Sequence, residues 1–225
     1  MAPVVGLIFH GVGMPRRRLE PGEAPYWLSE ATFLSVLDQI AALPNPDRIR
    51  LSFDDGNLSD YDVALQALLE RGLRADFFVL TGRLNQPGSL TEGHIRVLHE
   101  AGMGVGSHGI NHLDWTRLDP TTLRHELEDS RRVLEYLLDT PVREAAIPFG
   151  AWNGRVLRTL RQAGYTKAYS SDCGPMDTTA FLRPRTSITT VTGMDNIVNI
   201  LSGKMTPLSR LRRKLTMTLK QWRDI

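Results

Sequence analysis

The sequence contains one cysteine, Cys173, and no long hydrophobic run. A single cysteine excludes a disulfide within the chain, and with it the small disulfide-rich scaffolds. No apolar stretch approaches the roughly 18 residues that a membrane-spanning helix requires. A secretory signal is also missing, because residues 1–3 lead directly into a hydrophobic stretch without a basic segment or cleavage site. We therefore expect a cytoplasmic protein.

The composition is that of an ordinary globular protein, but the charge is unevenly distributed. The 225 residues are 41% hydrophobic and 23% charged, with a net charge of +2. Residues 1–203 carry 20 Lys and Arg against 24 Asp and Glu, whereas residues 204–225 carry seven basic residues against one acidic residue. We expect one folded domain over 1–203 followed by a basic helix over 204–225. The acidic body argues against a nucleic-acid partner.

Hydrophobic patterning predicts short strands that alternate with helices. The predicted strands are 4–9, 48–53, 75–80, 103–107, 142–147, 167–171 and 183–188. The predicted helices are 30–43, 60–71, 91–102, 120–138, 153–163 and 195–201. This alternation indicates parallel βαβ units, which suit an open doubly wound sheet or a (β/α) barrel. No glycine-rich phosphate-binding loop follows a strand, so we predict a barrel with about seven parallel strands.

Unusual residues gather after the predicted strands. They are His10, Asp54, Asp55, His108, His112, Pro148-Phe149-Gly150 and Asp172. Asp55-Gly56 alone is typical of a simple turn, and the two histidines alone are as well explained as structural residues. The carboxyl ends of barrel strands meet at one rim, however, so these side chains are expected to converge. Two imidazoles and one carboxylate can hold zinc with an open position, and a second carboxylate can act as a base.

Ser52-Phe53-Asp54-Asp55-Gly56, followed by Ser-His-x-x-x-His at 107–112, resembles the polysaccharide deacetylases of carbohydrate esterase family 4, the NodB-homology domain. The resemblance covers residues 4–190. It implies a deformed (β/α) barrel that binds one divalent metal, zinc being the expected ion, and removes N-acetyl groups from amino sugars by amide hydrolysis. By position, Asp54 corresponds to the catalytic base, and Asp55, His108 and His112 to the metal ligands. Pro148, Phe149 and Gly150 correspond to a motif whose aromatic backbone N–H helps to hold the oxyanion.

The chain departs from this family in two places. Ala146 stands where the family has an arginine, and the late Leu-x-His that supplies a general acid is missing. Phe9-His10-Gly11-Val12 resembles the start of a permuted subgroup that includes poly-N-acetylglucosamine deacetylases, which implies His10 as the acid. A catalytically inactive carbohydrate-binding domain is the alternative. Asp172 lies in the fourth-motif region, where the family residue orients the missing arginine, so its role stays open.

The basic tail has apolar residues at helical spacing, namely Leu208, Leu211, Leu215, Leu219 and Trp222. Its apolar face can cover the barrel, with the charges in solvent. Alternatively it attaches the protein peripherally to the inner membrane face, where the substrate would be a lipid-linked saccharide. A further enzymatic alternative, which the resemblance also allows, is deformylation of a lipid-linked formamido sugar.

Overall fold

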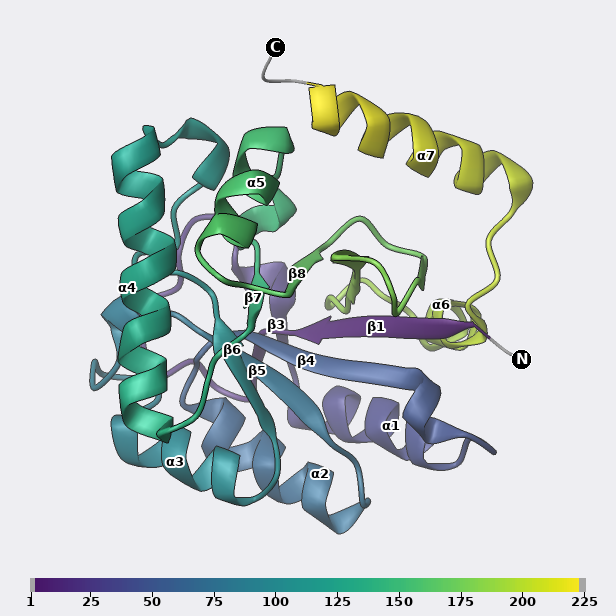
Figure 1. Ribbon diagram of the computed structural model, residues 1–225. Helices are drawn as coiled ribbons and strands as arrows, with labels where there is room; N and C mark the ends of the chain where they lie inside the picture. The colour runs from purple at the N-terminus through teal and green to yellow at the C-terminus, as the bar shows by residue number, and fades with distance from the viewer. Residues whose placement is uncertain (1–2, 223–225) are drawn as a thin grey trace.

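The computed structural model describes residues 3–222 and centres on a sheet of mostly parallel strands curved into a nearly closed barrel (Figure 1). The strands run in the order β10-β8-β7-β6-β5-β4-β1-β11. Their bounds are β1 Val4–Phe9, β4 Ile49–Asp55, β5 Ala75–Val79, β6 Gly104–Ser107, β7 Glu144–Ala146, β8 Lys167–Ser170, β10 Leu182–Pro184 and β11 Thr186–Ser187. All neighbours along this path pair in parallel, which confirms the predicted deformed (β/α) barrel.

The barrel is closed by a segment that the sequence analysis predicted as a single strand, 183–188. The structure divides it into β10 and β11, which are separated only by Arg185. β10 pairs with β8 and β11 pairs with β1, so this short segment joins the two ends of the sheet. Three further short strands were not predicted: β9 (Pro175–Met176) pairs antiparallel with β1, and β2 (Gly11–Val12) pairs with β3 (Trp27–Leu28).

Helices surround the barrel close to their predicted positions. They are α1 Glu30–Ala41, α2 Gln66–Glu70, α3 Glu92–Glu100, α4 Pro120–Leu138, α5 Gly154–Gln162 and α6 Met194–Ser202. The hydroxyls of Ser29 and Thr91 accept hydrogen bonds from the first turns of α1 and α3, as expected of N-cap residues. The predicted helix 60–71 is only partly α-helical, because Asp60–Leu65 forms a π-helix.

Two apolar regions support the carboxyl rim of the barrel. Outside the sheet, the stacked rings of Phe9, Phe53 and Phe77 pack toward α1, with centroids 5.3 Å and 4.8 Å apart. Inside the barrel, a smaller cluster contains Phe78, Ala146, Tyr169 and Met176. This inner cluster fills the barrel beneath its rim, so the rim has a packed floor rather than an open channel.

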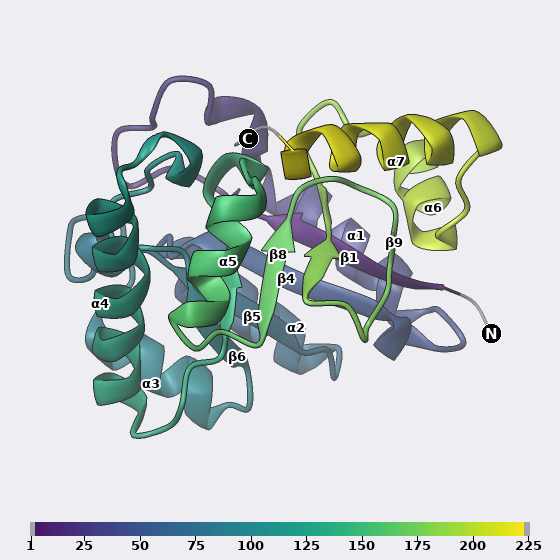
Figure 2. The same cartoon turned by 45° about the horizontal axis from the view of Figure 1, so that its top comes forward.

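Helix α7 (Pro207–Trp222) lies at the edge of the molecule, beyond α5 and on the side away from α1 and α2 (Figures 1 and 2). None of its residues is buried. Its leucines face solvent, so the expectation that its apolar face covers the barrel is wrong. Residues 223–225 of the predicted basic tail lie outside the described residues. Within 3–222, no helix combines the length and apolar character needed to cross a membrane.

A candidate metal-dependent active site

The predicted site residues meet in one pocket at the carboxyl rim of the barrel. The pocket has a volume of about 290 Å³, and its polar lining includes His10, Asp54, Asp55, His108, His112 and Arg185. Phe149 and Gly150 also line it, whereas Pro148 is buried behind them. The structure thus brings together residues from β1, β4, β6 and the loop after β7, as the convergence of parallel strand ends requires.

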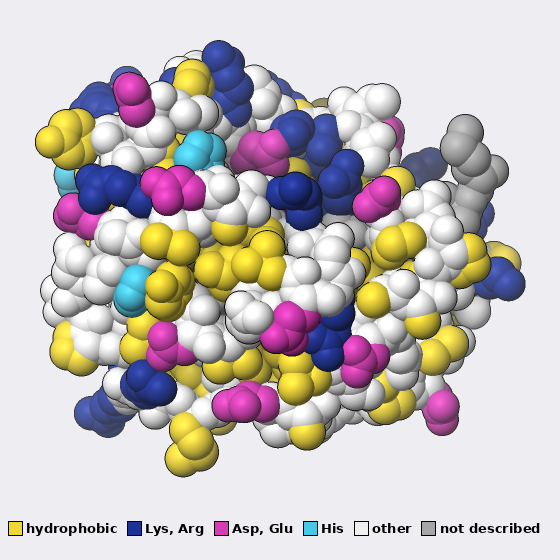
Figure 3. Space-filling view, turned by 90° about the horizontal axis from the view of Figure 1, so that it is seen from below, with side chains coloured by type: hydrophobic (Ala, Val, Ile, Leu, Met, Phe, Trp, Pro, Cys, Tyr) yellow, Lys and Arg dark blue, Asp and Glu magenta, His cyan; other side chains and the backbone are white. Residues whose placement is uncertain are grey.

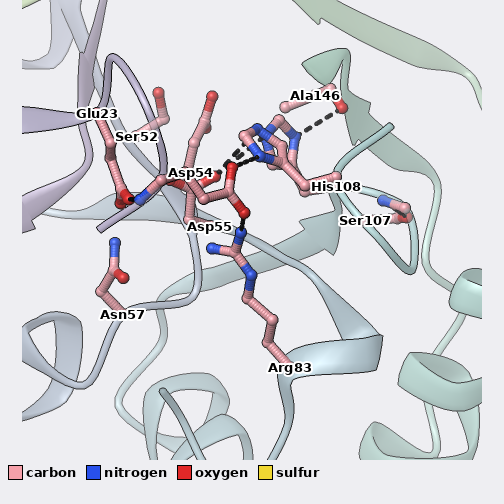
Figure 4. A network of polar contacts seen from close by, with 12 residues as sticks. Glu23, Ser52, Asp54, Asp55, Asn57, Arg83, Ser107, His108 and Ala146 are labelled. Atoms are coloured by element: carbon pink, nitrogen blue, oxygen red, sulfur yellow. Dashed lines mark hydrogen bonds and ion pairs between the residues drawn. The ribbon is translucent and has the colours of Figure 1, made fainter. Parts of the chain in front are cut away.

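Asp55, His108 and His112 form a candidate metal site. The Asp55 Oδ1 atom lies 3.5 Å from His108 Nε2 and 3.6 Å from His112 Nε2, and Figure 4 shows Asp55 and His108 close together. This oxygen is buried and has no hydrogen-bond partner among residues 3–222. A buried carboxylate oxygen without a partner is costly, and a cation between the three side chains would satisfy it. The donor set of one carboxylate and two imidazoles therefore fits a divalent metal such as zinc.

The second ring nitrogen of each histidine has a partner that fixes the ring. His108 Nδ1 lies 2.9 Å from the Ala146 carbonyl oxygen, and His112 Nδ1 lies 2.9 Å from Glu20 Oε2. Both Nε2 atoms are thereby left facing Asp55, an arrangement typical of metal-binding histidines. Burial lowers the pKa of His108 to about 4, so this ring is neutral near pH 7 and has a lone pair to offer.

Helix α4 holds the loop that carries both histidines. The buried Glu126 carboxylate accepts hydrogen bonds from the backbone N–H groups of Ile110 (2.8 Å) and Asn111 (3.2 Å), and another from the Asn111 side chain (2.7 Å). Gly109 has a φ of 85°, and a Cβ there would lie 2.8 Å from Glu126 Oε2. The loop conformation therefore requires glycine at 109 and an acceptor at 126.

Asp54 is held by an arginine that the sequence analysis did not identify. Arg185 Nη1 and Nη2 donate to Asp54 Oδ1 and Oδ2 at 2.7 and 2.8 Å, and Nη1 also lies 2.7 Å from Ser52 Oγ. Burial alone would raise the pKa of Asp54, but the charge and hydrogen bonds of Arg185, together with the neighbouring imidazoles of His108 and His10, outweigh it and hold this pKa below its usual value. Asp54 is therefore ionised and has a fixed orientation.

The sequence analysis noted that Ala146 stands where the family has an arginine. Asp54 nevertheless has an arginine partner, because Arg185 reaches this carboxylate from the break between β10 and β11. Asp54 and Arg185 are 131 positions apart in the sequence. The sequence placed Arg185 within a predicted barrel strand, which was the one sign that it could matter. The sequence did not show which residue it would pair with, because any acid that faces the barrel interior could have been its partner.

Glu20 is the second functional residue that the sequence analysis did not identify. It lies in the loop 11–26, for which the sequence analysis predicted neither a strand nor a helix. Glu20 contacts His112 and also pairs with Arg83 from the segment after β5. Nothing in the local sequence distinguishes Glu20 from other loop acids.

His10 and Phe149 both line the pocket. His10 directly follows β1, and its Nδ1 atom is buried without a hydrogen-bond partner. Its ring centroid lies 4.8 Å from that of Tyr26. Phe149 has a left-handed backbone (φ 57°), and its exposed ring lies 4.3 Å from the His112 ring. Both residues are thus within reach of a substrate bound at the candidate metal site.

Asp172 lies behind the pocket rather than in its lining. Its Oδ2 atom accepts hydrogen bonds from Trp152 Nε1 and Ser170 Oγ, both at 2.7 Å. Its Oδ1 atom lies 2.5 Å from Lys220 Nζ on α7. These contacts make Asp172 a junction between α7, β8 and the segment that precedes α5.

Comparisons with known proteins agree with this architecture. A family model described as polysaccharide deacetylase matches residues 42–168. The Bacillus subtilis (strain 168) protein YxkH is 23% identical over 155 residues, which are 66% of this chain but only 56% of YxkH. A chitooligosaccharide deacetylase of Rhizobium leguminosarum bv. trifolii is 27% identical over 160 residues, covering 71% of this chain and 67% of the relative.

Solved structures show the same fold. The Streptococcus pyogenes deacetylase PplD, in complex with acetate, superimposes with a TM-score of 0.76 at 19% identity, covering 90% of this chain and 99% of PplD. IcaB from Ammonifex degensii superimposes with a TM-score of 0.72 at 20% identity, covering 90% of this chain and 98% of IcaB. At these identities the likeness establishes the barrel architecture.

Proposed function

This chain belongs to the polysaccharide deacetylase family, and we propose that it is a metal-dependent hydrolase that removes N-acetyl groups from amino sugars of a glycan or a lipid-linked saccharide. The observation that carries the proposal is the pairing of two sites in one pocket. One is the set Asp55, His108 and His112, and the other is the ionised carboxylate of Asp54 beside it. Metal-assisted amide hydrolysis uses a Lewis acid that polarises the carbonyl and a base that takes a proton from water, both within reach of the same carbonyl.

In the proposed mechanism, Asp55, His108 and His112 hold a divalent cation, with zinc the expected ion. When bound, this cation polarises the acetyl carbonyl and makes water a stronger nucleophile. Asp54 accepts the proton of the attacking water, and Arg185 keeps its carboxylate ionised and oriented for this transfer.

On the other side of the substrate, His10 in its protonated form donates a proton to the leaving amine. The backbone N–H of Phe149 stabilises the negative charge that develops on the carbonyl oxygen. Both residues line the pocket that contains the metal ligands, which supports these roles.

The test combines metal analysis with product analysis on N-acetylglucosamine oligomers. We expect one bound divalent ion per chain and the release of acetate. Release of formate from a formamido sugar, without acetate from any N-acetylated saccharide, would assign the protein to deformylation instead. Saccharide binding without release of either acid would identify an inactive carbohydrate-binding domain.

A matched variant tests the base. Asp54→Asn keeps the shape of the side chain but cannot accept a proton, so turnover should fall by about 10²–10⁴-fold. Metal content should stay at one ion per chain, because Asp54 is not among the expected ligands. A turnover rate within a few-fold of wild type would show that another group is the base.

A further inference from the structure

Helix α7 presents a continuous apolar stripe to solvent. The stripe consists of Leu208, Leu211, Leu215, Leu219 and Trp222, whose side chains are 55–70% exposed. Steps of three and four residues place all five on one face of the helix. Large apolar side chains that occur singly on a surface need no explanation, but a stripe along a whole helix marks an interaction site.

The opposite face of α7 attaches the helix to the barrel. Only Arg213, Met217 and Lys220 are half-buried there, and Met217 packs against the apolar cluster beneath α5. Lys220 Nζ lies 2.5 Å from Asp172 Oδ1 and 3.1 Å from the Gly150 carbonyl oxygen. These contacts turn the stripe outward, which is the reverse of an ordinary surface helix that buries its apolar face.

Positive charge borders the stripe. Arg212 lies one helical turn from Leu208 and Leu215, and Lys214 lies one turn from Leu211, so both flank the stripe. Residues 207–222 contain no Asp or Glu. On the face of the molecule over α1, α2 and α3, by contrast, acidic and basic side chains are interspersed (Figure 3). Within the described chain, α7 therefore combines exposed apolar area with charge of one sign.

We propose that α7 binds an anionic lipid surface, with its apolar stripe in the boundary between headgroups and acyl chains and with Arg212 and Lys214 at the lipid phosphates. A cationic helix with a large apolar face suits this position. Pairing of two copies through the stripe would bring their flanking cations together without compensating acids. The charge pattern therefore favours lipid over a second copy of the chain.

The C-terminal end of α7 also lies close to the active-site pocket. Lys220, in the last turn of α7 and on the face opposite the stripe, contacts the Gly150 carbonyl, and Gly150 lines the pocket together with Phe149. The helix that carries the stripe thus ends beside the pocket lining.

Vesicle binding by the full chain tests this inference without any measurement of turnover. Vesicles of phosphatidylcholine alone are compared with vesicles that also contain phosphatidylserine, by co-sedimentation and fluorescence. Trp27, Trp115 and Trp152 are buried, so a blue shift and quenching by brominated lipid report on Trp222. We expect binding to the anionic vesicles, with both fluorescence changes, and weak binding to the neutral ones.

Two variants separate the apolar and the charged contributions. The double substitution Leu215→Asn with Leu219→Asn should weaken anionic-vesicle binding by at least about tenfold. Arg212→Glu with Lys214→Glu should abolish the preference for anionic lipid. As a matched control, Leu69→Asn with Val198→Asn removes two exposed apolar side chains from α2 and α6 and should leave binding unchanged.

Absence of wild-type binding to anionic vesicles would overturn the inference, as would equal binding of the stripe variant. A concentration-dependent dimer in sedimentation velocity that Leu215→Asn with Leu219→Asn dissociates would assign the stripe to a second copy instead. A protein that binds vesicles but releases no acetate would contradict only the proposed function.

Discussion

Asp54 and Asp55 are neighbours in the sequence, yet their carboxylates have opposite environments. Both oxygens of Asp54 accept hydrogen bonds from Arg185, whereas Oδ1 of Asp55 is buried without a partner between two imidazoles. The backbone also differs, because Asp55 leaves regular strand geometry and adopts a φ of 80° at the end of β4. One acid is therefore suited to proton transfer and the other to metal binding.

Arg185 should control the pH range of activity. In Arg185→Met the largest of the contributions that oppose the burial of Asp54 is lost, so the pKa of Asp54 should rise and the acidic limb of the pH–rate profile should move to higher pH. Loss of one partner of a buried ion pair should also cost about 3–5 kcal/mol of unfolding free energy. The more conservative Arg185→Lys keeps the charge and should move the limb less. Profiles that coincide for all three proteins would contradict this role.

His10 should act as the acid for the leaving amine. His10→Ala should lower turnover by about 10²–10⁴-fold on an N-acetylated amine, with metal content unchanged. Tyr26→Phe serves as the control for the neighbouring ring, because it keeps the aromatic contact with His10. Near-wild-type turnover of His10→Ala would require a different acid.

At the level of secondary structure, a loop and a helix from distant parts of the chain orient the candidate metal ligands. The loop 11–26 brings Glu20 onto His112, and α4 brings Glu126 under the turn between the two histidines. Strand ends alone place the ligands at the rim, but these two carboxylates determine how the ligands are oriented.

Glu20→Gln tests this support. The variant keeps an acceptor for His112 Nδ1 but loses its charge and weakens the ion pair with Arg83. Metal affinity should fall by about 10–100-fold, as for other residues that orient a ligating histidine. The measurement is competitive titration with a chelator, which needs no substrate. Glu100→Gln, at an exposed position at the end of α3, is the control that removes the same charge away from His112, and equal affinities of the two variants would refute the specific role of Glu20.

For the molecule as a whole, one enclosed acid in the barrel lowers the free energy of unfolding at neutral pH. Asp76 on β5 is largely enclosed, and its burial together with the nearby charge of Glu144 raises the pKa of Asp76 to about 6. Between pH 4 and 6 the folded protein holds a proton on Asp76 that the unfolded chain has lost. Folding stability from this group is therefore greatest at low pH and declines as the pH rises through this window.

Asp76→Asn should remove this decline. At pH 7 the variant should be more stable than wild type by about 1–2 kcal/mol, whereas at pH 4 the two should be equal. Urea unfolding at several pH values measures the difference. Asp47→Asn changes the net charge equally at an exposed position, so it should not alter the pH dependence. If the stability of the wild-type protein does not fall relative to that of Asp76→Asn between pH 4 and 6, the raised pKa of Asp76 is contradicted.

Closure of the barrel and construction of the site depend on the same segment. Residues 182–187 pair with β8 at one end and with β1 at the other, and Arg185 occupies the break between the two pairings. Its guanidinium lies 5.0 Å from the ring centroid of Phe78 inside the barrel and reaches Asp54 at the rim. The residue that interrupts the last strand thus also orients the proposed base.

The strands and helices, the barrel and the side chains that gather at its rim could be predicted from the sequence. Strand and helix positions follow from local periodicity and caps, and the parallel order brings Asp54, Asp55, His108 and His112 to one rim. The tertiary structure alone decided the partners of these residues. Glu20 meets His112 across 92 positions and Arg185 meets Asp54 across 131.

The sequence also did not predict that the apolar stripe of α7 faces solvent. Periodicity identifies an apolar face but does not say what that face meets, and contacts of Lys220 and Met217 on the other side turned it outward. Such pairings depend on how distant segments are placed in space, and local residue preferences carry no information about that placement.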